Sequence, residues 1–157
     1  MLFRSWTFGG GPYELITSGK LGALGSGIPF ASSAKLARPD ARSVAFVGDG
    51  TFGFHGMEFD TAVRHNLPFV AIVGNDACWN AESQLQRRDY GENRMFGCEL
   101  LPARYDAWAT ALGGHGELVE SADQMEGALA RAVASGKPAV INVMTESIAA
   151  PVIKREA

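Results

Sequence analysis

Short apolar segments alternate with longer amphipathic segments along this chain, and this alternation limits its possible folds more than any other feature. The apolar segments have the length of buried β-strands and comprise residues 43–47, 67–74, 116–119 and 139–144. The segments with helical spacing comprise residues 25–36, 54–66, 103–112 and 122–134. Such alternation favours a parallel sheet with helices on both faces, which binds ligands at the carboxyl ends of its strands. The sequence therefore predicts an α/β, doubly wound fold.

Size, charge and cysteine content narrow the possible partners. A chain of 157 residues has the usual size of a single domain with one core. Its net charge of −3 gives no reason to expect a nucleic acid or a membrane surface as a partner. No apolar run is long enough to cross a membrane, and no segment resembles a secretory signal. Because the two cysteines form no C-x-x-C pair, we expect a cytoplasmic protein.

The chain divides into three parts of unequal size. Residues 1–12 end in Gly-Gly-Gly-Pro and show neither helical nor strand periodicity, so we interpret them as the remnant of a linker in a longer protein. Residues 13–150 carry the alternating pattern, and residues 151–157 form a tail. Within the domain, residues 75–98 are rich in Asn, Gln and Arg. They are predicted to form a long polar loop, which in a compact domain is usually functional.

A glycine-rich loop containing one carboxylate follows the first apolar segment. Residues 48–53 match G-x-G-x-x-G between a strand and a helix, which is also the pattern of an NAD-binding Rossmann domain. In that alternative, a dehydrogenase, the glycines approach a pyrophosphate and Asp76 holds a ribose hydroxyl. Asp49 argues against it, because a carboxylate inside a loop that cradles a diphosphate repels the diphosphate unless a cation lies between them.

A second carboxylate can complete a metal site with Asp49. Asp76 follows the next apolar segment, so both side chains can converge on one ion at the ends of neighbouring strands. Mg²⁺ suits this arrangement, since it takes oxygen ligands from one or two carboxylates and from substrate phosphates. A backbone carbonyl just beyond Asp76 can add another ligand. In a simpler interpretation, Asp49 caps a helix that begins near Phe54, and Asn75-Asp76 is an ordinary turn.

Gly48-Asp49-Gly50 and Asn75-Asp76 are separated by 24 residues. This spacing resembles the thiamine diphosphate signature of the superfamily that includes acetolactate synthase, benzaldehyde lyase, benzoylformate decarboxylase and 2-hydroxyacyl-CoA lyase. The resemblance extends to residues 22–27, 58–61 and 66–68 and covers about residues 18–143. It implies the C-terminal thiamine diphosphate-binding domain of such an enzyme, with thiamine diphosphate and Mg²⁺ as cofactors.

The resemblance also implies roles for individual residues. Asp49 and the side chain of Asp76 would be metal ligands, with the backbone oxygen of Cys78 as a third. Asp76 departs from the pattern, because many relatives have Asn there; the added negative charge still suits Mg²⁺ but puts the metal preference in question. The residues implied in binding the cofactor are Gly22, Ala23, Leu24, Gly48, Asp49, Gly50, Thr51, Asn75 and Asp76.

Three of the remaining residues have competing interpretations. By the resemblance, Leu24 occupies the place of the bulky residue that holds the cofactor in a bent conformation, whereas its spacing is equally that of a core leucine. Glu82 lies where some members of the superfamily carry a catalytic glutamate, although members that look more similar to this chain lack one. His55 lies one turn beyond the diphosphate loop and can line the site. No catalytic residue is therefore assigned, and Glu82 and His55 are the candidates.

The resemblance further implies a lyase or transferase that acts on C–C bonds of 2-keto acids or 2-hydroxyacyl compounds. Its substrate would be a small 2-keto acid, an aldehyde or an acyl-CoA. In the family, the glutamate that activates the cofactor comes from an N-terminal pyrimidine-binding domain of the same or a partner subunit, and no segment here corresponds to that domain. We therefore expect an incomplete active site that a homodimer or homotetramer of a longer protein completes. A non-catalytic assembly domain is the third alternative.

Overall fold

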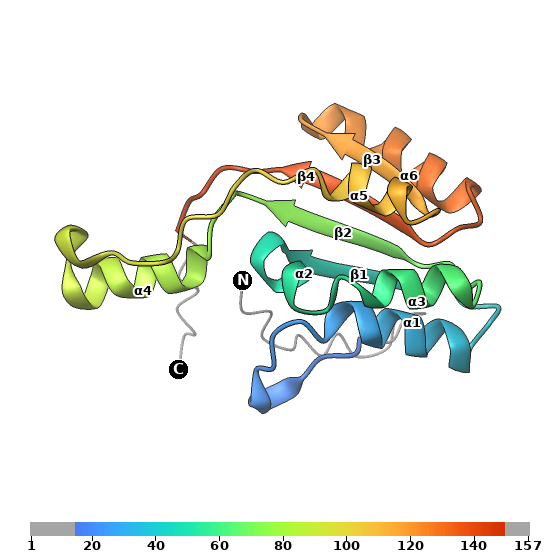
Figure 1. Cartoon of the computed structure of the whole chain (residues 1–157), viewed down its shortest axis with the longest axis horizontal. Helices are drawn as coiled ribbons and strands as arrows, with labels where there is room; N and C mark the ends of the chain where they lie inside the picture. Colours follow the sequence, from blue (N-terminus) through green and yellow to red (C-terminus); the bar gives the residue numbers. More distant parts are fainter. Residues whose placement is uncertain (1–14, 150–157) are drawn as a thin grey trace, which may run out of the picture.

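A four-stranded parallel sheet forms the centre of the computed structural model, which describes residues 15–149 apart from the side chain of Lys20. Its strands are β1 (Val44–Gly48), β2 (Val70–Asn75), β3 (His115–Val119) and β4 (Ala139–Met144), in the order β1-β2-β4-β3. Because every pair is parallel, the carboxyl ends of all four strands lie along one edge of the sheet (Figure 1). The predicted linker (1–12) and tail (151–157) lie outside the described residues.

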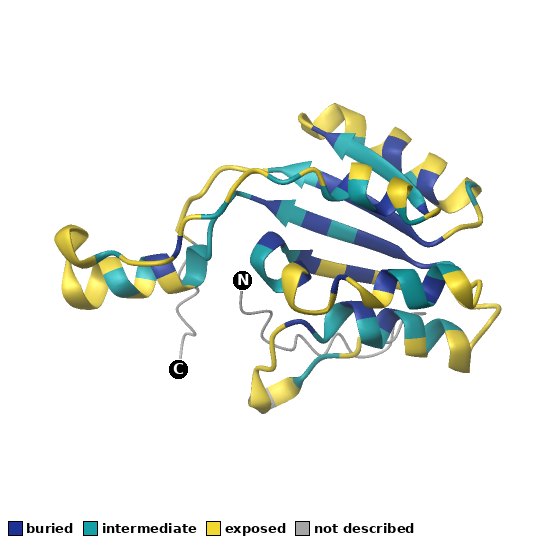
Figure 2. Ribbon diagram, in the orientation of Figure 1, coloured by how far each residue is buried: buried dark blue, intermediate teal, exposed yellow. Residues whose placement is uncertain are grey.

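Helices lie on both faces of the sheet, as the sequence predicts. On one face lie α1 (Gly27–Ala37), α2 (Asp49–His55), α3 (Glu58–Arg64) and α5 (Tyr105–Ala111), and on the other lies α6 (Met125–Ala134). Residues of β2 alternate between the two cores, so Ala71 and Val73 face the first group of helices while Val70 and Ile72 face α6. This two-sided burial explains why β2 is a continuous apolar run without polar alternation (Figure 2). The prediction of a doubly wound α/β fold is confirmed.

The prediction of a long loop over residues 75–98 is wrong, because that segment contains helix α4 (Asn80–Tyr90). Only Ser83 of this helix is buried, so α4 has no apolar stripe from which its period could be recognised. It projects beyond the carboxyl edge of the sheet and is largely exposed or half-buried (Figures 1 and 2). Its side chains make polar contacts instead, among them the ion pair between Arg87 and Glu92 in the short helix η2 (Glu92–Arg94).

The single helix predicted over residues 54–66 is also wrong in its bounds. Two helices occupy the region, and α2 already begins at Asp49, inside the glycine-rich loop. Gly56 and Met57 separate α2 from α3. Glycines disfavour helix interiors, yet here Gly50 and Gly53 lie within α2. Two further short helices, η1 (Gly19–Leu21) and η3 (Ala122–Gln124), precede α1 and α6.

Glu117 on β3 links the sheet to α6 and gives a pH-dependent contribution to stability. Hydrogen bonds from Arg131 lower the pKa of the Glu117 carboxyl, and His115 also contributes. A lowered pKa stabilises the fold above the ordinary pKa of glutamate, about 4.3, and this contribution is lost as pH falls through the folded value. Glu117→Gln is expected to reduce the free energy of unfolding by about 1 kcal/mol at neutral pH, since Arg131 is largely exposed. Urea titrations at about pH 7 and pH 3.5 should show the difference shrinking in acid; a pH-independent difference would contradict this assignment.

Candidate active site

The two motifs predicted to form one site lie side by side at the carboxyl edge of the sheet. Gly48 ends β1 and pairs in register with Gly74 of the neighbouring strand β2. Asp49 follows Gly48 directly, and Asn75 and Asp76 follow Gly74. The parallel pairing thus brings together two segments that are far apart in sequence, at the edge where doubly wound folds bind ligands.

Asp49 is a buried carboxylate, with 2% of its surface exposed. The N–H of Gly50 donates to its Oδ1 (2.8 Å), and the N–H of Cys78 donates to its Oδ2 (3.3 Å). Burial raises the pKa of Asp49 above its ordinary value, and the negative charge of Asp76 raises it further, against the effect of these hydrogen bonds. The interpretation of Asp49 as the cap of a helix starting near Phe54 is wrong, because α2 starts at Asp49 itself. Two mutually repelling carboxylates, one of them buried, form an arrangement that a cation would stabilise.

The turn after Asp76 is held in an unusual backbone conformation. Ala77 has a φ of 53°, in the left-handed region that residues other than glycine rarely adopt. Its N–H donates to the side-chain Oδ1 of Asn75 (3.2 Å), and its carbonyl accepts from the N–H of Leu100 (2.7 Å). Within residues 15–149, no hydrogen bond occupies the carbonyl of Cys78. That oxygen is therefore available as a ligand, beside a turn whose geometry is fixed on both sides.

Gly50 and Trp79 bring the segment after β1 into close contact with the segment between β2 and α4. A β-carbon added at Gly50 would lie 2.6 Å from the indole ring of Trp79, so only glycine fits here without displacing the ring. The ring also packs edge-on against Phe54, with 5.6 Å between centroids. Trp79 lies immediately before α4 and thus packs against α2. Thr51 lies half-buried in the first turn of α2.

The upstream segment, residues 22–24, lies near α2 through the glycine that follows it. Gly25 has a φ of 82°, and a β-carbon there would collide with the imidazole of His55 and the β-carbon of Phe54. Gly22, Ala23 and Leu24 are themselves exposed. The interpretation of Leu24 as a core leucine is wrong, because 40% of its surface is exposed. Of the candidate catalytic residues, His55 is exposed at the end of α2 and Glu82 is exposed on the first turn of α4.

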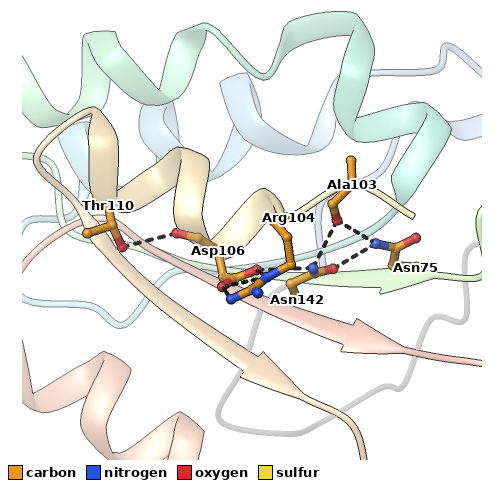
Figure 3. A network of polar contacts seen from close by, with 6 residues as sticks. All are labelled: Asn75, Ala103, Arg104, Asp106, Thr110 and Asn142. Carbon is orange, nitrogen blue, oxygen red and sulfur yellow. Dashed lines mark hydrogen bonds and ion pairs between the residues drawn. The ribbon is translucent and has the colours of Figure 1, made fainter. Parts of the chain in front are cut away.

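Sequence reasoning missed a buried polar network that includes Asn75, the last residue of β2 (Figure 3). It joins Asn75 to Asn142 on β4 and to Asp106 on α5. All three residues are buried, and every buried side-chain nitrogen or oxygen in residues 15–149 has a hydrogen-bond partner. The signal that could have revealed it is Asn142, the single polar residue of the strand Ala139–Met144.

Comparison with known proteins identifies the family. The model of the C-terminal TPP-binding domain of thiamine pyrophosphate enzymes matches residues 2–143. This chain belongs to that family. Its cofactor, thiamine pyrophosphate, is the same compound as thiamine diphosphate. The resemblance drawn from the two motifs is confirmed, and an NAD-binding dehydrogenase domain is not favoured.

The relatives are enzymes much longer than this thiamine diphosphate-binding domain. It is 49% identical over 138 residues to a probable acetolactate synthase of Mycobacterium bovis, a match that covers 87% of this chain and 25% of that protein. It is 41% identical over 139 residues to the human 2-hydroxyacyl-CoA lyase 2, covering 85% and 22%. A solved structure of the thiamine diphosphate-dependent 4-hydroxybenzoylformate decarboxylase of Rhodococcus jostii RHA1 has a TM-score of 0.74 at 26% identity, covering 80% and 24%. The chain thus spans about a quarter of the length of these relatives.

Proposed function

We propose that this domain binds the diphosphate of thiamine diphosphate through a Mg²⁺ ion held by Asp49, Asp76 and the backbone oxygen of Cys78. The observation that carries the proposal is the buried carboxylate of Asp49, whose pKa is raised by burial and by the charge of Asp76. A cation between the two carboxylates would relieve both penalties. The carbonyl oxygen of Cys78 is available as a ligand, and the backbone N–H of Cys78 already donates to Asp49. The residues present therefore fit the metal.

The composition of the donor set favours Mg²⁺ over a metal held entirely by side chains. Within residues 15–149, no three His, Cys, Asp or Glu side chains gather at one point. Structural zinc sites need four protein ligands, usually Cys or His. Mg²⁺ instead keeps several waters and is bound through one or two carboxylates together with substrate phosphates. Two carboxylates and a carbonyl leave room for diphosphate oxygens and water.

The remaining contacts with the cofactor are assigned by position. Gly48, Gly50 and Thr51 would line the diphosphate, while residues 22–24 would contact the aminopyrimidine, with the exposed Leu24 supporting the cofactor between its rings. Asn75 has a different role, because its side-chain nitrogen and oxygen both form hydrogen bonds within the protein. Its contribution to cofactor binding is through the turn that it holds.

The whole protein would act on C–C bonds of a small 2-keto acid, an aldehyde or an acyl-CoA, as a lyase or transferase like its relatives. When bound, thiamine diphosphate supplies the electron sink for such chemistry. This chain would contribute the metal and diphosphate half of the site. The other half would come from an N-terminal pyrimidine-binding domain of the same or a partner subunit, in a homo-oligomer. Glu82 and His55 stay candidates for contact with the substrate.

Calorimetric titration of the chain with thiamine diphosphate, with and without Mg²⁺, tests the proposal. We expect weak binding that requires Mg²⁺, and little or no turnover of a 2-keto acid by the chain alone. NAD(H) titrated in the same way separates the dehydrogenase alternative, which predicts binding without a metal. An assembly domain predicts that neither ligand binds. Metal-independent binding of thiamine diphosphate would overturn the proposed site.

The contact between Gly50 and Trp79 gives a second prediction for the same site. In Gly50→Ala the new methyl group would displace the indole ring, which packs between the two loops. We expect affinity for Mg²⁺-thiamine diphosphate to fall about tenfold, the effect of about 1.4 kcal/mol. The matched control is Gly53→Ala in the same helix, where an added β-carbon meets no other atom within 4 Å. Equal affinities of the two variants in calorimetry would show that the contact does not shape the site.

A further inference from the structure

Buried polar groups of β2, β4 and α5 form one network beside the carbonyl of Ala103 (Figure 3). Asp106 in the first turn of α5 is 5% exposed, and Asn75 and Asn142 are each 0% exposed. The guanidinium of Arg104 donates to both carboxylate oxygens of Asp106, with Nη2 2.6 Å from Oδ2 and Nε 2.9 Å from Oδ1. Asn142 Nδ2 donates to Asp106 Oδ1 (3.2 Å), and Asn75 Nδ2 donates to Asn142 Oδ1 (3.1 Å). The carbonyl of Ala103 accepts from both amides.

Two groups that can only accept, the ionised Asp106 and the carbonyl of Ala103, set the direction of the hydrogen bonds between the two amides. Paired with Arg104, which lowers its pKa, Asp106 is ionised at neutral pH and can only accept. Asn142 must therefore turn its NH₂ toward Asp106 and its oxygen toward Asn75. Asn75 must in turn direct its NH₂ toward Asn142, which leaves its own oxygen facing the opposite way.

That oxygen of Asn75 accepts the N–H of Ala77, the residue in the left-handed conformation. Ala77 lies between Asp76 and Cys78, so its conformation sets the directions of the Asp76 side chain and the Cys78 carbonyl. A left-handed alanine is disfavoured and persists only where its surroundings hold it. Asn75, at the end of the network, accepts the N–H of Ala77, and the N–H of Leu100 donates to the carbonyl of Ala77. The backbone of Ala77 also interacts with the carboxylate of Asp49.

We propose that Asp106 and Asn142 are positioning residues, which act through Asn75 and Ala77 to aim the side chain of Asp76 and the carbonyl of Cys78 at the metal. The inference rests on the proposed Mg²⁺ site and assigns roles to residues outside it. If β4 had only a structural role, an apolar residue at position 142 would stabilise it as well as Asn142 does. Buried polar groups add stability only when every hydrogen-bond partner is present. Groups that orient metal ligands, by contrast, commonly change metal affinity by tenfold or more when they are removed.

The test uses Asn142→Leu, which keeps similar volume but removes the link between Asp106 and Asn75. Asp106→Asn is the second variant, because it keeps the shape and removes the negative charge that accepts from Asn142. It also serves if the first variant does not fold. Ile141→Val is the control, since Ile141 is the neighbouring residue of the same strand and packs in the other core, against α6. Two quantities are measured: the Mg²⁺ concentration for half-maximal binding of thiamine diphosphate, and the hydrogen-exchange rate of the Ala77 amide by NMR without ligand.

We expect the half-saturating Mg²⁺ concentration to rise about tenfold in Asn142→Leu and to rise in Asp106→Asn, with less than twofold change in Ile141→Val. At matched global stability, the Ala77 amide should exchange faster in both network variants, and its exchange rate should be unchanged in the control. Unchanged Mg²⁺ dependence and exchange in the network variants would overturn the inference and leave the proposed function standing. If the unaltered chain shows no Mg²⁺-dependent binding, the proposed function fails. The Ala77 exchange rate then decides the positioning of the turn: faster exchange supports it, and unchanged exchange overturns it.

Discussion

Replacing Asp49 with alanine is expected to abolish Mg²⁺-dependent binding of thiamine diphosphate to this domain. Asp49 is the only buried carboxylate of the two predicted ligands, and its oxygens already contact the N–H groups of Gly50 and Cys78 on both loops. Without it the metal would lose one of two charged ligands, and the diphosphate would lose its bridge to the protein. We expect affinity to fall by at least about 100-fold, equivalent to about 2.7 kcal/mol, in a calorimetric titration.

Asp60→Ala is the matched control for this experiment. Asp60 is an acidic residue of the neighbouring helix α3 and pairs with Arg64 on the surface, away from the strand ends. We expect its replacement to leave the affinity for thiamine diphosphate unchanged, because Asp60 is outside the proposed site and surface ion pairs contribute little to stability. A similar loss of binding in both variants would indicate a general effect of negative charge. Retained binding in Asp49→Ala would exclude Asp49 as the metal ligand.

Phe59→Ala is expected to cause the largest loss of stability among single substitutions in the core. Phe59 is 0% exposed and packs against Phe69 and Trp108, with ring centroids 5.9 and 5.8 Å apart. Truncation removes both ring contacts and leaves a cavity between α3, α5 and the sheet. The free energy of unfolding should fall by about 3–5 kcal/mol, measured by urea unfolding followed by circular dichroism.

Phe96→Ala makes the same chemical change at a side chain that is 87% exposed. We expect it to change the free energy of unfolding by less than about 0.5 kcal/mol, as surface substitutions usually do. Comparable losses in both variants would mean that Phe59 is not part of a tightly packed core. Phe59 lies in α3, outside the proposed site. Any effect of its replacement on cofactor binding should therefore follow from the lower folded fraction alone.

The parts of the structure that the sequence predicts correctly are those with a strong local signal. The apolar runs of β2 and β4 are buried on both faces, so their composition alone marks them as strands of a parallel sheet. The placement of Asp49 and Asp76 at neighbouring strand ends follows from the same topology. Helix α4 lacks such a signal, because it has no apolar stripe and buries only Ser83.

The features that could not be predicted depend on contacts between distant segments. Leu24 is exposed while the neighbouring Gly25 packs against α2, and no local period encodes this arrangement. The polar network needs Asn75, Asp106 and Asn142 to meet across α5, β2 and β4. Asn142 was visible as a polar residue in an apolar strand, but its partners depend on the strand order β1-β2-β4-β3. Asp106 has the ordinary sequence context of a carboxylate in the first turn of a helix.

Locating the metal itself tests the central claim most directly. Crystals of the chain grown with Mn²⁺ and thiamine diphosphate allow the ion to be placed by its anomalous scattering, since Mn²⁺ prefers the same kinds of oxygen ligand as Mg²⁺. We predict one ion bound to the carboxylates of Asp49 and Asp76, to the carbonyl oxygen of Cys78 and to oxygens of the diphosphate. An ion bound elsewhere, or a diphosphate held at this edge of the sheet without an ion between it and Asp49, would contradict the account.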